Sequence, residues 1–177
     1  MRDADVAAFT AFVEARSAAL FRTALLLTGD RHLADDLVQS TLEKVCRNWR
    51  RVRAADSSEA YARRILVNLA HDRWRGRRGP SEVPLDDGIG GGSAAPYVDP
   101  YKELDVRDEL MRTLHTLPAG MRTVLVLRYF EDLDDAEIGA LLDVSPSSVR
   151  SQAARGLAKL RSAAGRRSSG ARSGGAA

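Results

Sequence analysis

Residues 134–161 read DDAEIGALLDVSPSSVRSQAARGLAKLR, and this stretch has the pattern of two short helices joined by a tight turn. Asp134 can cap the first helix while Glu137 reaches back from three residues on, which is a capping-box arrangement. Asp143 occupies the turn, where a residue with positive φ is often needed and Asp is tolerated. Ser145, followed by a proline at the first helical position, can cap the second helix. The stretch therefore predicts a helix-turn-helix.

Apolar and charged side chains divide the two predicted helices into distinct faces. The predicted buried stripe of the second helix consists of Val149, Ala153, Leu157 and Leu160. Residues 131–143 hold six acids and no Lys or Arg, whereas residues 144–161 hold four bases and no acid. A basic second helix behind an acidic first one suits entry into the DNA major groove. The alternative is an ordinary helical hairpin with a solvated basic face, but caps, turn and charge together favour DNA binding.

Composition limits the class of protein. The chain has 177 residues, a formal net charge of +3 and a pI of about 9.3, and it is rich in helix-forming Ala, Leu and Arg. No apolar run is long enough to span a membrane and no signal-peptide pattern opens the chain, so we expect a cytoplasmic protein without membrane insertion. The three histidines and Cys46 lack metal-ligand spacing, and no phosphate-binding glycine loop follows a strand. We expect neither an enzyme nor a cofactor.

The N-terminal half has the pattern of three helices, over residues 6–27, 31–49 and 57–77. Gly29 can end the first helix in a left-handed cap, and Asp30 can begin the second. Residues 49–78 hold nine bases against three acids, interleaved with Trp49 and Trp74. This mixture suits nucleic acid, through phosphate contact and base stacking. The alternative, a helix end with cations that complement its dipole, needs fewer bases.

A change of composition separates the two halves of the chain. Residues 79–101 contain Gly-Pro and the run GIGGGSAAP, which predict a flexible linker. Residues 165–177, rich in Gly, Ser, Ala and Arg, are predicted to be a disordered tail. The predicted fold class is therefore all-α, with two small helical domains, 1–78 and 102–164, joined by the linker.

Three stretches carry a resemblance to a known family: LFRTALLLTGDRHLADDLVQSTL at 20–42, AYARRILVNLAHDRWRGRR at 60–78, and residues 117–161, which include the helix-turn-helix. In this order they resemble the extracytoplasmic-function (ECF) sigma factors of bacteria, in an actinobacterial, SigE-like branch. The resemblance covers residues 6–161. It implies that the first domain is a sigma region 2 helical bundle and the second a sigma region 4 helix-turn-helix. The implied function is to bind core RNA polymerase and direct promoter-specific transcription initiation.

The resemblance also implies contacts. The polymerase would be bound at the clamp coiled coil of its β′ subunit and at its β flap, with the β′ contact made by Asp35, Asp36, Leu37, Val38 and Gln39. The minus-ten element of promoter DNA, with one base turned out of the stack, would be held by Trp49, Arg50, Arg53, Arg64, Asn68, Arg73, Trp74, Arg75 and Arg77. The minus-thirty-five element would be read in the major groove by Ser147, Ser148, Arg150, Ser151, Gln152 and Arg155. Many relatives are held inactive by an anti-sigma factor, which is a further implied partner.

Two other classes of protein are weighed against this one. A one-component helix-turn-helix transcription regulator would carry a helical sensor domain in place of the first domain. The basic, Trp-bearing third helix argues against a sensor, which should show a ligand pocket. A helical RNA-binding protein is the weaker third alternative.

Overall fold

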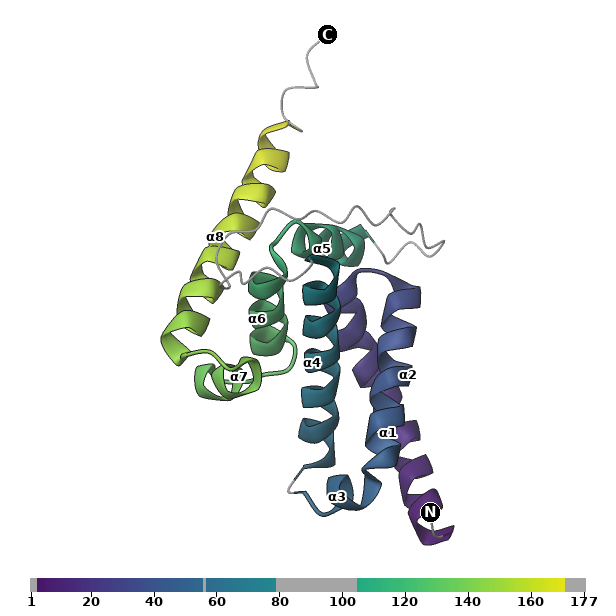
Figure 1. Cartoon of the computed structure of the whole chain (residues 1–177). Coiled ribbons are helices and arrows are strands. Elements are labelled where there is room, and N and C mark those ends of the chain that lie inside the picture. Colours follow the sequence, from purple (N-terminus) through teal and green to yellow (C-terminus); the bar gives the residue numbers. More distant parts are fainter. Residues whose placement is uncertain (1–2, 56, 79–104, 171–177) are drawn as a thin grey trace. The chain divides into compact units, whose positions relative to one another are not determined.

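A computed structural model of the chain describes residues 3–55, 57–78 and 105–170, and within these residues all regular secondary structure is helical (Figure 1). The chain divides into two compact units, Met1–Val83 and Pro84–Ala177. The all-α fold with two helical units is thereby confirmed. The expected linker at 79–101 lies outside the described residues.

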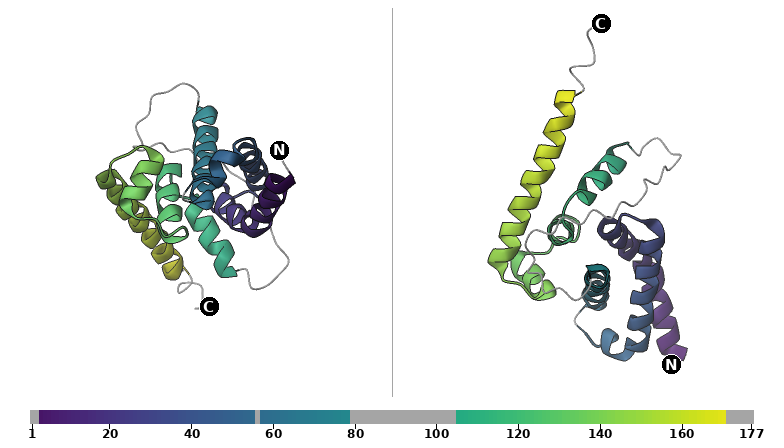
Figure 2. Two further views of the ribbon diagram at one scale, coloured as in Figure 1. Left: turned by 90° about the horizontal axis from the view of Figure 1, so that it is seen from below. Right: turned by 45° about the horizontal axis from the view of Figure 1, so that its top comes forward.

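The first unit contains α1 (Asp3–Thr28), α2 (Arg31–Arg47), α3 (Trp49–Arg53) and α4 (Ser58–Arg78). The long helices α1, α2 and α4 pack side by side, as Figures 1 and 2 show. Gly29, with φ of 70°, ends α1, and the Asp30 carboxylate accepts a hydrogen bond from Leu33 N–H at 2.8 Å, so both predicted caps are confirmed. Fully buried aliphatic side chains from the three helices, among them Leu27, Val45 and Leu66, form the core.

The junction between α2 and α3 differs from the prediction. The sequence predicts one helix from residue 31 to 49, but α2 ends at Arg47, and Asn48, with φ of −108° and ψ of 18°, interrupts it. The chain then re-enters a short helix over Trp49–Arg53, which extends beyond the predicted end at residue 49. Burial of Trp49 and Val52 against the neighbouring helices stabilises this extra turn of helix.

Trp49, predicted to stack on DNA, is instead packed inside the first unit, where it holds α3 against α1. Its side chain is only 4% exposed. The indole contacts the Phe9 ring edge-on at 5.3 Å between centroids and the Phe12 ring at 5.4 Å, both from α1. Arg53 adds an ion pair with Asp5 at 3.1 Å. A ring enclosed in this way has no face left for a nucleic-acid base, so Trp49 belongs to the core.

The second unit contains α5 (Asp105–His115), α6 (Ala119–Tyr129), α7 (Asp135–Leu142) and α8 (Pro146–Gly170). Helix α6 is its central element, because every residue from Met121 to Leu127 is buried and α5, α7 and α8 all pack against it. Arg122 is among these buried residues, and burial lowers the pKa of its guanidinium to about 10. Arg122 Nη1 lies 3.0 Å from His115 Nδ1. This arginine is therefore part of the core and not of a DNA surface.

The predicted helix-turn-helix is confirmed by its caps and its turn. Asp134 Oδ1 accepts hydrogen bonds from the N–H groups of Ala136 and Glu137, and Glu137 Oε2 accepts one from Asp134 N–H, which completes the capping box. Asp143 adopts φ of 58° and ψ of 46°, the left-handed conformation expected in the turn. The Ser145 hydroxyl accepts a hydrogen bond from Ser148 N–H at 3.2 Å and so caps α8.

The buried face of α8 is rotated relative to the prediction. Val149 and Ala153 are buried as expected, but Leu157 and Leu160 are only partly buried. The face that packs on α6 instead continues through Gly156, because a glycine there lets Leu125 approach closely. Helix α8 runs to Gly170, and residues 171–177 lie outside the described residues.

Candidate nucleic-acid and polymerase surfaces

The N-terminal half of α8 presents a polar and basic surface, which we call the reading face. It consists of Ser147, Arg150, Ser151 and Arg155, all exposed, with Ser148 partly exposed beside them. Positions separated by three or four residues share one side of a helix, so these side chains point the same way. Hydroxyl and guanidinium groups are donors suited to phosphates and base edges. The reading face thus has the chemistry expected of a recognition helix.

Gln152, a predicted base reader, is not on the reading face. The side chain is 3% exposed because it projects between α8 and the rest of the second unit, in line with Val149 and Gly156. A buried amide cannot reach an adenine edge. The reading face therefore offers arginine and serine as its base-contacting groups, without the glutamine.

An ion-pair chain links the reading face to the two preceding helices. Arg150 Nη1 lies 3.7 Å from Asp135 Oδ2, and Asp135 Oδ1 accepts a hydrogen bond from Arg128 Nη2. Asp135 stands at the start of α7 and Arg128 near the end of α6. Sequence reasoning missed this role of Asp135, since contacts between side chains of different helices leave no periodic signal.

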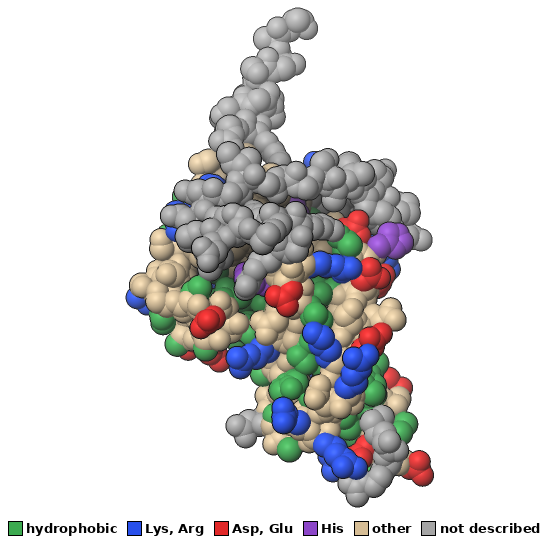
Figure 3. Space-filling view, in the orientation of Figure 1, with side chains coloured by type: hydrophobic (Ala, Val, Ile, Leu, Met, Phe, Trp, Pro, Cys, Tyr) green, Lys and Arg blue, Asp and Glu red, His purple; other side chains and the backbone are tan. Residues whose placement is uncertain are grey.

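The first unit carries a second basic surface, formed by α3 and the outer side of α4. Arg50, Arg53, Arg64, Asn68 and Arg73 are exposed, and Trp74 is partly exposed. The space-filling view shows Lys and Arg side chains spread over the face of this unit that is turned to the viewer (Figure 3). Arg75 and Arg77 lie on α4, but their side chains are outside the described set. Except for Trp49, the predicted minus-ten residues whose side chains are described thus lie at least partly at the surface.

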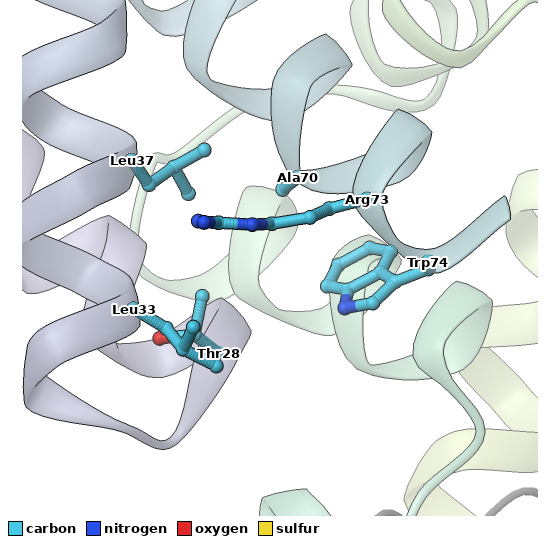
Figure 4. Close-up of a pocket in the computed structure, with 6 residues that line it drawn as sticks. All are labelled: Thr28, Leu33, Leu37, Ala70, Arg73 and Trp74. Atoms are coloured by element: carbon cyan, nitrogen blue, oxygen red, sulfur yellow. The ribbon is translucent and has the colours of Figure 1, made fainter. Parts of the chain in front are cut away.

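Trp74 and Arg73 line a small hollow at the end of the first unit, together with Thr28, Leu33, Leu37 and Ala70 (Figure 4). The Arg73 side chain extends across this hollow, and its Nη2 lies 3.4 Å from Asp36 Oδ2. The basic surface and the acidic residues of α2 are therefore in direct contact through one ion pair.

The DDLVQ segment of α2 has two sides. Asp35, Asp36 and Gln39 are exposed and form a polar patch. Leu37 and Val38 are buried, at 2% and 9% exposure, and belong to the core between α2 and its neighbours. The exposed side of the segment is therefore made by Asp35, Asp36 and Gln39, while the side chains of Leu37 and Val38 pack inside the unit.

Comparison with known proteins agrees with this architecture. Residues 12–79 match the family model for sigma-70 region 2, and residues 107–160 match that for sigma-70, region 4. The RNA polymerase sigma-E factor of Streptomyces coelicolor is 32% identical over 157 residues, which cover 89% of this chain and 86% of that protein. The ECF RNA polymerase sigma factor SigE of Mycolicibacterium smegmatis is 34% identical over 149 residues, covering 80% and 56% of the two chains.

Solved structures share the fold. The sigma factor RpoE of Bartonella quintana, crystallised with the anti-sigma factor NepR, superposes with a TM-score of 0.67 at 22% identity, covering 87% of this chain and 94% of that one. CnrH, in complex with the cytosolic domain of CnrY, gives a TM-score of 0.59 at 22% identity, over 88% and 86% of the chains.

Two helical units with these matches define an RNA polymerase sigma factor, which acts with core polymerase at promoter DNA. More narrowly, the chain belongs to the ECF sigma factors, in the SigE-like branch. The one-component regulator is not favoured, since the first unit matches region 2 and not a sensor. Within the described residues, no His, Cys, Asp and Glu cluster could hold a metal ion, and no helix could cross a membrane.

Proposed function

We propose that the reading face of α8 recognises the minus-thirty-five element in the major groove. The observation that carries this proposal is the exposed Ser147, Arg150, Ser151 and Arg155 on one side of a helix whose entry is set by the capped helix-turn-helix. Arg150 is the proposed base reader, because guanidinium pairs bidentately with guanine. The serines and Arg155 supply phosphate contacts, which position the helix without specifying sequence.

The basic surface of α3 and α4 is the proposed minus-ten site. Arg50, Arg53 and Arg64 offer a cationic track for the opened strand, and Asn68 offers hydrogen bonds to a base edge. Trp74 is partly exposed whereas Trp49 is buried, so Trp74 replaces Trp49 as the proposed stacking group. Arg75 and Arg77, further along the same helix, are also proposed minus-ten residues.

The polar patch of Asp35, Asp36 and Gln39 is the proposed docking site for the β′ clamp coiled coil. Its carboxylates suit basic side chains on a partner helix. With these three contacts the chain acts as a non-catalytic specificity subunit, and we place it in the cytoplasm with the polymerase. The sigma factor RpoE, which shares this fold, was crystallised with the anti-sigma factor NepR, and this supports an anti-sigma factor as a further partner.

Holoenzyme reconstituted from core polymerase and the full chain tests the minus-thirty-five assignment. The probe is a promoter library randomised over the upstream element. Arg150→Ala should reduce discrimination at one base pair by about 1–3 kcal/mol and leave the other positions unchanged. A control variant, Arg22→Ala on the exposed side of α1, should leave the profile as it is. An unchanged profile for Arg150→Ala would remove this arginine from base reading.

A further inference from the structure

Asp135 lies between two arginines that differ in their surroundings. It is the first residue of α7, and its side chain is 18% exposed. Arg128, 28% exposed, donates to its Oδ1 from behind, while Arg150, 61% exposed, faces its Oδ2 at 3.7 Å. Arg128 therefore fixes the carboxylate through Oδ1, and Oδ2 is left to interact with Arg150.

This arrangement limits the rotamers that the Arg150 side chain adopts. An exposed arginine loses much rotamer freedom when it binds, and that loss weakens the contact. A carboxylate already held by Arg128 favours the guanidinium orientations that point Nη1 toward α7. Arginine carries five N–H donors in a rigid fork, so one ion pair leaves the other donors for a base. Asp135 can thus orient the Arg150 guanidinium and still leave N–H donors free to contact a base.

The same carboxylate has a second effect, of opposite sign. A negative charge beside the reading face repels DNA phosphates of any sequence, so it weakens sequence-independent binding. Removing the Asp135 charge should therefore lower discrimination between base pairs and raise affinity for DNA of any sequence, which are two measurable effects of opposite sign. Loss of fold would lower both quantities together.

We propose that Asp135 is a positioning residue that sets how strongly Arg150 discriminates between base pairs. The proposal rests on the function proposed above, in which Arg150 reads the minus-thirty-five element. Asp135 itself need not touch the DNA. The ion pair, the support from Arg128 and the position at the start of α7 carry the inference.

The experiment compares holoenzymes that contain the full chain with Asp135→Asn, Arg150→Ala, or both substitutions, on the library randomised over the upstream element. Asp135→Asn should reduce discrimination at the base pair read by Arg150 by about 1.5-fold to fivefold, the range of exposed ion pairs. In the Arg150→Ala background it should cause no further loss at that pair. Affinity for DNA without a promoter should rise with Asp135→Asn.

Glu137→Gln is the matched control, because Glu137 is a second acid in the first turn of α7 and its partner is the Asp134 backbone, not Arg150. It should leave discrimination at that base pair unchanged. Two results would overturn the positioning role. One is a loss of discrimination in Glu137→Gln equal to that in Asp135→Asn. The other is a loss caused by Asp135→Asn that is the same whether or not Arg150 is present. If Arg150→Ala itself changes no base preference, the proposed function fails instead, and the two failures are distinguished.

Discussion

Gly139→Ala and Gly156→Ala form a matched pair that tests the packing of the helix-turn-helix. Both glycines lie inside helices of the second unit and both are buried. A Cβ at position 139 would lie 2.7 Å from the backbone carbonyl oxygen of Val144, which belongs to the turn. A Cβ at position 156 would lie 3.0 Å from Leu125 Cδ1, the end of a side chain. The two substitutions therefore meet a rigid and a flexible neighbour.

The expected free energies follow from these contacts. In either helix, alanine gains about 1 kcal/mol over glycine in intrinsic propensity. At position 139 the turn must shift, which costs about 3 kcal/mol as severe overpacking and about 1 kcal/mol for weakening the 3.0 Å hydrogen bond from Val144 N–H to Gly139 C=O. The net loss is about 3 kcal/mol. At position 156 a rotation of Leu125 costs about 1 kcal/mol, so the net change is close to zero.

Hydrogen exchange followed by mass spectrometry is the suitable assay, since it reports on the second unit separately from the first. Exchange from the buried amides of α8 should accelerate about 100-fold in Gly139→Ala, which corresponds to about 3 kcal/mol, and by less than about fivefold in Gly156→Ala. Peptides from α2 and α4 should be unchanged in both variants. Equal protection of α8 in the two variants would refute the reasoning from the turn.

Other substitutions separate core residues from surface residues. Trp49→Ala should lower the free energy of unfolding of the first unit by about 3–5 kcal/mol. Urea denaturation monitored by the fluorescence of Trp74 measures this change. Trp74→Ala should leave that unit folded and weaken binding of a single-stranded minus-ten oligonucleotide by about 1–3 kcal/mol; wild-type affinity would exclude stacking by Trp74. Asp36→Arg should weaken the capture of core polymerase without changing the circular dichroism spectrum. The control Glu14→Arg, on the exposed side of α1, should leave capture at the wild-type level. Equal capture by the two variants would place the docking site elsewhere.

Local signals in the sequence predicted much of this fold correctly. The capping box at Asp134, the left-handed Asp143 and the caps at Gly29 and Asp30 each depend on residues within one turn of helix, and the structure contains all of them. The all-α class likewise follows from helical spacing of apolar residues. Interactions of this range are readable because the chain itself brings the groups together.

The sequence was a poorer guide to the direction in which individual side chains face. Trp49, Leu37 and Gln152 were predicted at binding surfaces by residue type or by position in a motif, and all three are buried. Their burial depends on partners distant in sequence: Phe9 and Phe12 for Trp49, and the close approach of α6 at Gly156 for the face that holds Gln152. Helical spacing gives the faces of one helix but not the rotation at which a neighbour meets it.

Transcription in vitro tests the central claim most directly. Core RNA polymerase, the purified full chain and fragmented genomic DNA would be combined, and the 5′ ends of the transcripts sequenced. We predict start sites that depend on the chain and lie downstream of two shared motifs at constant spacing, with the upstream motif altered in preference by Arg150→Ala. A folded chain that forms no complex with core polymerase and yields no promoter-specific transcripts would contradict the account.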